Sequence, residues 1–196
     1  MPGRPEEELS ELMSSLRRMY SHVARITGKV LEAIRDWKPV EIEDDVGLAE
    51  MLKDTIENQA TLFLARYQPL GIELLKAKAV IRVSYDLYRI ARYEREIIKI
   101  IKLTEGKVEP SQRLVETAEK AFTMLDLAFN AFYEGDQEAF QKVKDLDNEI
   151  DEAYTAVLRA VAGKESLERR EVVEALVLRH LERIADHSVY IAGQAL

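Results

Sequence analysis

Apolar residues recur at spacings of three and four along almost the whole chain. Between residues 7 and 37 the apolar positions are Leu9, Leu12, Leu16, Met19, Val23, Ile26, Val30 and Ile34. This spacing places them on one face of an α-helix, which can then be buried against other helices. The same spacing returns in every later segment, and none alternates in the manner of a strand. The sequence therefore predicts an all-α protein.

Proline, glycine and acidic residues divide this helical pattern into six segments. The breaks fall at Lys38-Pro39, at Gln68-Pro69, between Gly106 and Pro110, at Gly135 and at Gly163. Proline cannot continue a helix, and glycine commonly follows a helix end. The predicted helices cover about residues 7–37, 44–67, 70–103, 110–133, 136–162 and 166–194. Because the connections are short, consecutive helices should be antiparallel, as two tandem three-helix bundles.

The second half of the chain repeats a motif of the first half at an offset of 94 positions. Residues 181–187 read LERIADH, and residues 87–93 read LYRIARY. Both copies keep the apolar residues and the arginine, whereas Glu182 and Asp186 correspond to Tyr88 and Arg92. This indicates an internal duplication, with residues 1–105 as the first three-helix repeat and residues 106–196 as the second. Only the second copy carries the two carboxylates.

Composition excludes several classes of protein. The 196 residues include no cysteine, so disulfides and thiolate metal sites are excluded. No apolar run approaches the roughly 20 residues that span a bilayer, and the N-terminus lacks the apolar core of a signal peptide. The formal net charge of -8 argues against a general nucleic-acid binder. We expect a cytoplasmic protein.

Four carboxylates are the candidate metal ligands. Asp147 and Asp151 in one predicted helix, and Glu182 and Asp186 in the next, are each four residues apart and so share a helical face. Both pairs lie in apolar lines, where unpaired acids are costly unless a cation neutralises them. Oxygen ligands favour Mg, Mn or Fe, and zinc remains an option if a histidine joins them.

Two other interpretations apply to the same residues. Arg179 and Arg183 lie one turn from the acids and offer ion pairs in place of a metal. His187, next to Asp186, is interpreted as a further ligand, as a donor to Asp186, or as a partly buried histidine beside the site.

The motif residues resemble those of a known family. The segment VLRHLERIADHSVYI at residues 177–191 is similar to the signature of the PhoU family, and LDNEID at residues 146–151 resembles the family's other acidic motif. The resemblance implies a cytoplasmic, all-helical regulator that binds metal clusters through paired acidic motifs. Family members restrain phosphate uptake by acting on a phosphate ABC transporter, which implies its ATPase subunit as a partner. In many bacteria they also signal to a sensor kinase.

The resemblance assigns the metal positions residue by residue. Asp147, Asp151, Glu182 and Asp186 match the family's ligands. The corresponding positions of the first repeat hold Lys53, Glu57, Tyr88 and Arg92, so we predict one metal cluster at most. A homodimer, and attachment to the membrane only through a partner, are also compatible with such a regulator.

The first repeat is basic where the second is acidic. Its predicted stripe on one helix consists of Tyr88, Arg92, Arg95, Lys99 and Lys102. This stripe is interpreted either as a docking surface for an acidic partner or a membrane, or as an ordinary solvated face paired with acids such as Glu96.

Three classes of function remain open. A regulatory binding protein accounts for the duplication and the motifs, and we therefore expect no enzymatic activity. A metal-free helical adaptor, or a regulator of another ion transporter such as one for potassium, is the alternative. A carboxylate-bridged di-metal enzyme is disfavoured, because such sites use a Glu-x-x-His element that is missing at these acids.

Overall fold

The structure, a computed structural model, describes residues 4–195. Within that range it contains six helices and no strand, which confirms the all-α prediction. The helices are α1 (Pro5–Asp36), α2 (Glu43–Tyr67), α3 (Gly71–Thr104), α4 (Gln112–Glu134), α5 (Gln137–Ala162) and α6 (Arg169–Ala192). Each predicted end lies within three residues of the observed one.

Three of the helices end at a residue in the left-handed conformation. These residues are Trp37 after α1 (φ 49°), Gln68 after α2 (φ 47°) and Gly135 after α4 (φ 70°). After α1 and α2 a proline follows within two residues, so the chain cannot continue as a helix. The amide of Gln68 donates to the Leu64 carbonyl oxygen at 3.0 Å, which closes the last turn of α2. Local sequence therefore fixes where these helices stop.

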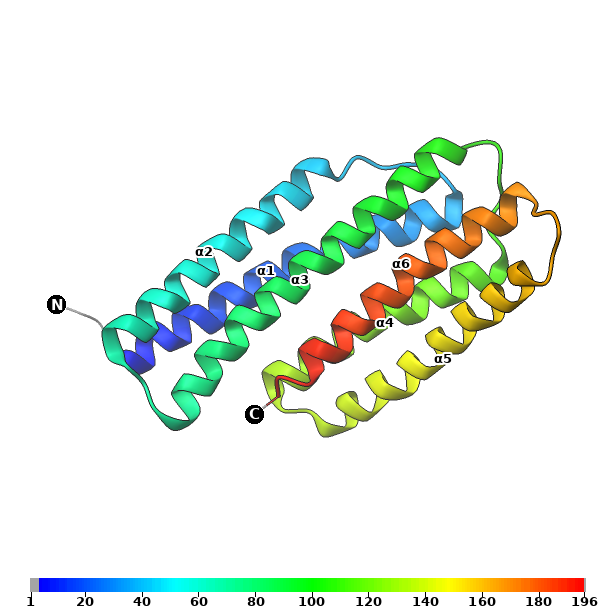
Figure 1. Cartoon of the computed structure of the whole chain (residues 1–196). Helices are drawn as coiled ribbons and strands as arrows, with labels where there is room; N and C mark the ends of the chain where they lie inside the picture. The colour runs from blue at the N-terminus through cyan, green and yellow to red at the C-terminus, as the bar shows by residue number, and fades with distance from the viewer. Residues whose placement is uncertain (1–3, 196) are drawn as a thin grey trace.

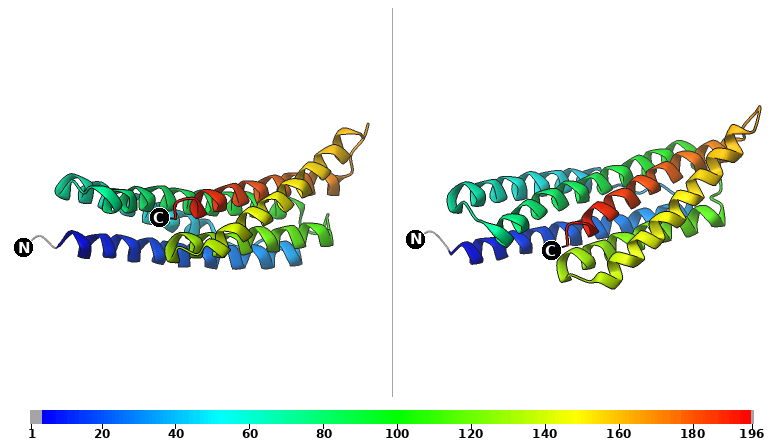
Figure 2. Two further views of the ribbon diagram at one scale, coloured as in Figure 1. Left: turned by 90° about the horizontal axis from the view of Figure 1, so that it is seen from below. Right: turned by 60° about the horizontal axis from the view of Figure 1, so that its bottom comes forward.

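Four helices form the centre of the molecule. α1 packs against α3 and α4, and α6 packs against α3 and α4, so each repeat contributes two central helices. α2 covers α1 and α3 at one edge, and α5 covers α4 and α6 at the other. In Figure 1 the hairpin of α2 and α3 and the hairpin of α5 and α6 turn at opposite ends of the molecule. Figure 2 shows α1 and α4 on one side and α3 and α6 on the other.

One apolar core runs through both repeats. Its buried residues come from all six helices, and α5 contributes least, with only Ala139, Val143 and Ile150 buried. Between α1 and α4 the Tyr20 ring stacks on Phe129 with 3.9 Å between ring centroids, and the Tyr20 hydroxyl donates to Asp126 at 2.7 Å. Since the halves share a core, the division into residues 1–105 and 106–196 as separate folding units stays a prediction.

The buried face of α3 follows a strict heptad pattern. One line of fully buried positions, which we call the seam, alternates in spacing between three and four, and it consists of Val80, Val83, Leu87, Ile90, Glu94, Ile97 and Ile101. Ala77, Ser84 and Ala91 beside the seam are also fully buried. A seven-residue repeat keeps one face of a long helix turned toward its neighbours. The seam is apolar except for the carboxyl group of Glu94, which has no exposed surface.

Glu94 is held in the core by a single hydrogen bond. The hydroxyl of Thr27 on α1 donates to Glu94 Oε1 at 2.5 Å, while Oε2 has no hydrogen-bond partner among the described residues. Burial raises the pKa of Glu94 to about 8, and the Thr27 hydrogen bond opposes that shift. The carboxyl group is therefore protonated at neutral pH.

None of the helices in the described part of the chain is both long enough and apolar enough to cross a membrane.

Candidate metal centre

The structure brings the two acidic pairs together at the contact between α5 and α6. Asp147 and Asp151 lie on α5, Glu182 and Asp186 lie on α6, and the two helices pack against each other. Asp151 is exposed, and the other three side chains are partly buried. Asp147 Oδ1 is shielded from solvent and has no hydrogen-bond partner within residues 4–195. A buried oxygen of this kind needs a proton or a cation.

The carboxylates repel one another. The pKa of Asp147 is raised to about 6, first by burial and then by the neighbouring charges of Asp151, Asp186 and Glu182. The pKa of Asp151 is raised by burial and by Asp186. The pKa of Glu182 is raised by burial and by Asp186, with Arg179 and Arg183 opposing the shift. All four acids therefore belong to one electrostatic cluster.

Two arginines on α6 neutralise part of this cluster. Arg179 Nη1 lies 2.6 Å from Glu182 Oε2, and Arg183 Nη1 lies 3.0 Å from Asp186 Oδ2. The two acids of α5 make no ion pair in the described chain. In this arrangement no three His, Asp or Glu side chains of residues 4–195 form a group that could hold a metal ion. Metal binding would require the α6 carboxylates to turn away from their arginines toward Asp147.

The cluster fits a hard cation in its chemistry, although not in its present side-chain rotamers. Its donors are all carboxylate oxygens, and the orphaned oxygen of Asp147 lies among three other negative charges. A cation at this point would satisfy that oxygen and remove the repulsion. The four side chains remain the predicted ligands.

His187 does not face these acids. Its Nδ1 lies 2.7 Å from Oδ1 of Asp86 on α3, and both side chains are largely buried. The His187 ring also contacts Tyr93 at 5.7 Å and Tyr190 at 5.5 Å between centroids. Of the three interpretations of His187, the partly buried histidine therefore agrees with the structure. Its hydrogen bond joins the two repeats rather than supporting Asp186.

Sequence reasoning missed Asp86 as the partner of His187. The available signal was an acid set among the apolar positions Val83, Leu87 and Ile90. The 94-residue offset relates Asp86 to His180 and Tyr93 to His187, and the rings of Tyr93 and His180 lie 6.0 Å apart. The duplicated positions thus meet twice across the contact between α3 and α6, once as an acid–histidine pair and once as two rings.

Replacing Asp86 with alanine is expected to lower the free energy of unfolding by about 2 kcal/mol, because a buried hydrogen bond involving a charged group is lost and His187 is left unpaired. Chemical denaturation measures the change. Ser188→Ala is the matched control, since its buried hydroxyl donates to the Ile184 carbonyl of its own helix and to no other group among residues 4–195. Equal effects of the two substitutions would show that the Asp86–His187 pair does not join the repeats energetically.

The equivalent positions of the first repeat form no acidic cluster. The Lys53 ammonium lies 2.8 Å from Asp54 and 5.2 Å from the centre of the Tyr88 ring. The Arg92 guanidinium lies over the same ring at 5.9 Å. Two cations and a tyrosine thus occupy three of the four equivalent positions, and Glu57 occupies the fourth. One metal cluster at most stays a prediction.

The predicted basic stripe is divided between two surfaces. The hydroxyl of Tyr88 donates to Glu50, and Arg95 donates to Glu43, so both side chains are engaged with α2. Arg92, Lys99 and Lys102 are exposed. The five residues therefore do not form one free docking surface, because Tyr88 and Arg95 contact α2 while the other three face solvent.

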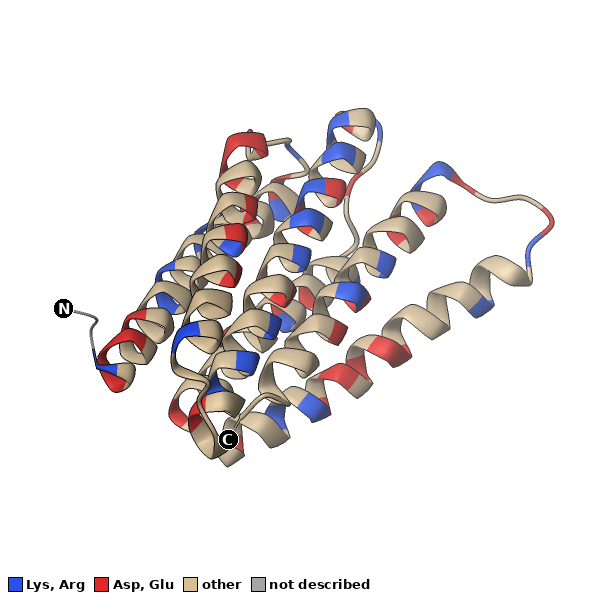
Figure 3. Ribbon diagram, turned by 60° about the vertical axis from the view of Figure 1, so that its left-hand side comes forward, with Lys and Arg blue, Asp and Glu red and all other residues tan. Residues whose placement is uncertain are grey.

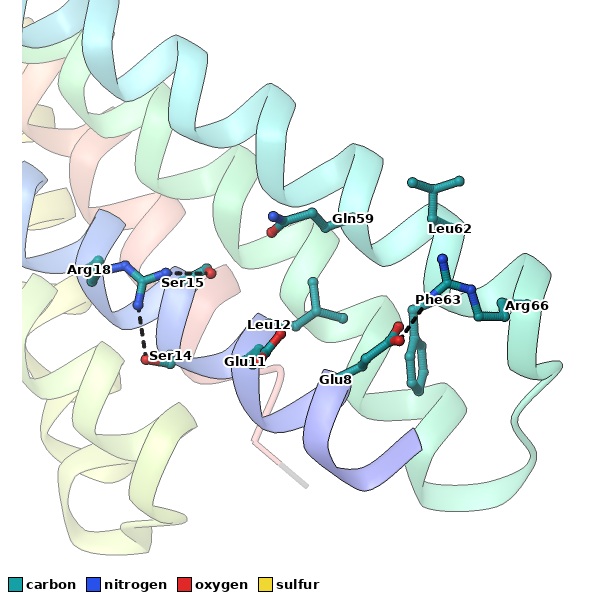
Figure 4. A pocket seen from close by; sticks show the side chains of 10 residues that line it. All are labelled: Glu8, Glu11, Leu12, Ser14, Ser15, Arg18, Gln59, Leu62, Phe63 and Arg66. Carbon is teal, nitrogen blue, oxygen red and sulfur yellow. Dashed lines mark hydrogen bonds and ion pairs between the residues drawn. The ribbon is translucent and has the colours of Figure 1, made fainter. Parts of the chain in front are cut away.

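A groove between α1 and α2 lies apart from the acidic cluster (Figure 4). Its arginines are engaged within its own walls: Arg66 donates to Glu8 at 2.6 Å, and Arg18 donates to Ser14 at 3.2 Å and to Ser15 at 2.8 Å. We assign no function to this groove.

The fold and the acidic cluster define a class: a duplicated six-helix protein with one carboxylate-rich centre, in its second repeat. The model of the PhoU domain matches residues 114–195, which is the repeat with the intact motif. A phosphate-specific transport system accessory protein PhoU homolog from Synechocystis sp. is 30% identical, covering 94% of this chain and 89% of the relative. A homolog from Archaeoglobus fulgidus is 28% identical over 98% of this chain and 93% of the relative. The chain belongs to the PhoU family.

Solved structures confirm the fold. The crystal structure of PhoU from Pseudomonas aeruginosa superposes with a TM-score of 0.88, at 21% identity, over 97% of this chain and 96% of the other. The PhoU structure from Streptococcus pneumoniae gives a TM-score of 0.78 at 20% identity, over 97% and 94% of the two chains.

Proposed function

We propose that the protein is an accessory regulator of a phosphate-specific transport system and that it acts through protein contacts rather than catalysis. Family membership supports the proposal, because the relatives named above are accessory proteins of such systems. The proposed partner is the ATPase subunit of a phosphate ABC transporter, and the proposed second partner is a sensor kinase. Binding to these partners would hold the protein at the cytoplasmic side of the membrane.

The proposal includes a metal centre at Asp147, Asp151, Glu182 and Asp186. The observation that carries it is the shielded oxygen of Asp147, which lacks a partner and is surrounded by three other acids. Magnesium, manganese and iron suit an all-carboxylate site, and zinc fits less well because His187 is committed to Asp86. When bound, the cation would neutralise the α5–α6 contact and draw the two helices together.

A metal-free adaptor is the second candidate. The ion pairs of Arg179 with Glu182 and of Arg183 with Asp186 favour it, because they already compensate two of the four charges. In this case the α5–α6 face would act as an electrostatic surface. The presence or absence of bound metal separates the two candidates.

Co-purification tests the regulatory proposal. The tagged protein is expected to retain the ATPase subunit of the phosphate transporter from detergent-solubilised membranes, at either high or low phosphate. The control prey is the ATPase subunit of an unrelated ABC transporter, which should not be retained. Absence of the phosphate transporter subunit in both phosphate conditions would contradict the proposal.

A further inference from the structure

The exposed side of α3 carries a row of cations. On the face opposite the buried seam, residues at alternating spacings of three and four point to solvent. We call the row of its cations the basic ridge, and it consists of Lys78, Arg82, Arg89, Arg92 and Lys99. Arg89 is partly buried, and Glu96 occupies the position between Arg92 and Lys99. Since ridge and seam share the seven-residue period, the ridge keeps to one side of the long helix. Figure 3 shows blue at successive turns of α3.

Exposed apolar side chains accompany the ridge. Leu75 (47% exposed) precedes the first cation, and Leu103 (73% exposed) follows the last. Tyr85 (43% exposed) lies between Arg82 and Arg89. At 1.5 Å per residue, the distance from Leu75 to Leu103 along the helix is about 42 Å. The surface has the length of a helix of about 28 residues.

Aromatic rings, rather than carboxylates, hold the central arginines in place. Arg89 donates to the hydroxyl of Tyr85 at 3.0 Å and to that of Tyr93, and its guanidinium lies 5.1 Å from the Tyr93 ring centre. Arg92 lies over Tyr88. Within residues 4–195, Lys78, Arg82, Arg89 and Arg92 make no ion pair, whereas Lys99 pairs with Glu96 at 2.9 Å. The ridge therefore presents ordered positive charge that is largely unneutralised.

Acids border the ridge on both sides. On α2, Glu43 and Glu50 contact side chains of α3. On α6, which also packs against α3, Glu182 and Asp186 belong to the acidic cluster, and each is paired with an arginine of its own helix. The bordering helices therefore mix acids with cations, whereas most cations of the ridge have no acidic partner. A narrow acidic rod would meet the cations alone, whereas a broad anionic surface would also meet the bordering acids.

We propose that the basic ridge is the docking site for an acidic amphipathic helix of a partner protein. The partner helix carries carboxylates at spacings of three and four, with an apolar side chain toward each end to contact Leu75 and Leu103. It lies along the exposed side of α3 as an additional helix. The ridge lies outside the acidic cluster, so this docking does not require a metal ion.

A lipid membrane is a poorer occupant on the same observations. The chain has a net charge of -8, and the acids of α2 and α6 would approach the lipid headgroups together with the ridge. Nucleic acid is disfavoured by the same net charge. A partner helix with its acids in one line contacts the ridge without approaching the acids of α2 and α6.

A designed peptide tests the proposal on the full-length protein. The probe is a fluorescein-labelled helical peptide of about 28 residues, with glutamates at heptad spacing and a leucine at each end. Fluorescence anisotropy should show binding that weakens at least about tenfold in a Lys78→Glu, Arg82→Glu, Arg92→Glu variant. The matched control changes three exposed cations elsewhere, as Arg18→Glu, Lys38→Glu and Lys107→Glu, and should bind within about twofold of the unchanged protein.

The position and orientation of the bound peptide distinguish docking from nonspecific electrostatic attraction. A scrambled peptide of the same composition should bind about tenfold more weakly, because its acids surround the helix. The chain has no cysteine, so single Lys78→Cys and Lys99→Cys variants provide unique thiols. A peptide with one terminal cysteine should form a disulfide with only one of them. Equal binding of both peptides, or equal trapping at both positions, overturns the proposal.

Two measurements identify the other possible occupants. If the ridge variant loses binding to vesicles of phosphatidylserine and phosphatidylcholine while peptide binding is unchanged, the ridge is a membrane surface and the proposal is wrong. If the unchanged protein is a dimer by sedimentation velocity and the ridge variant is a monomer, the occupant is a second copy, which also overturns it. Neither result bears on the phosphate transporter contact or the metal centre.

Discussion

Replacing Asp147 and Asp186 with asparagine is expected to abolish stoichiometric metal binding. The double substitution keeps side-chain size but removes one ligand charge from α5 and one from α6. Loss of even an outer-shell partner weakens metal binding about 10–100-fold, so loss of two direct ligands should weaken it by at least about 100-fold. Elemental analysis of the purified protein, followed by calorimetric titration with Mn²⁺, measures the change.

The matched control lies on the same helix. Asp145 and Glu149 are also four residues apart on α5, but Asp145 accepts a hydrogen bond from Gln141 and Glu149 pairs with Lys120 of α4. The Asp145→Asn, Glu149→Gln variant should retain the metal. Trace metal in the unchanged protein that is unaffected by Asp147→Asn, Asp186→Asn would favour the metal-free adaptor.

Replacing Glu94 with glutamine is expected to stabilise the protein at neutral and alkaline pH. Folding raises the pKa of Glu94 to about 8, from an ordinary value of 4.5. Between these values the folded state binds one more proton than the unfolded state, so stability falls as pH rises from about 4.5 and levels off above about 8. At 1.36 kcal/mol per pKa unit, Glu94 lowers the free energy of unfolding by about 3 kcal/mol at pH 7. Glutamine can still accept the Thr27 hydrogen bond and does not titrate.

Denaturation at pH 5.5 and pH 8 tests this expectation. The Glu94→Gln variant should lose much less stability between the two pH values than the unchanged protein does. Asp147 also favours protonation in the folded state, but its pKa of about 6 confines its effect to more acidic pH. The control is Glu96→Gln, which changes a partly exposed acid two residues away on α3, on the side that faces away from the core. An identical pH dependence in the Glu94→Gln variant and the unchanged protein would refute the assignment of a buried, protonated Glu94.

Helix positions and the acidic pairs were predictable from sequence because both depend on local spacing. Lys38-Pro39 and Gln68-Pro69 end helices through backbone sterics, which need no information from the rest of the fold. The spacing of four between Glu182 and Asp186 places both on one face of any helix. The comparison of residues 87–93 with residues 181–187 identified the positions at which the two repeats differ in charge.

Contacts between distant helices were not predictable in the same way. Asp86 and His187 are 101 residues apart, and their pairing depends on the side-by-side packing of α3 and α6. Of the two interpretations of the stripe of Tyr88, Arg92 and Arg95, the ordinary face paired with acids agrees with the structure, in which Arg95 and Lys99 pair with Glu96. Periodicity gives the spacing of a stripe, but which direction faces solvent depends on where α2 and α6 pack against α3.

The sequence by itself determined the six helices, the duplication, the family and the four candidate ligands, because each is encoded in short-range spacing or in a contiguous motif. Only the tertiary structure decided that Asp147 has a shielded, unpartnered oxygen, that His187 joins the repeats, and that the cations of α3 form an exposed ridge. Burial and charge compensation are properties of surfaces that meet across the fold. They are set when helices from different parts of the chain pack together.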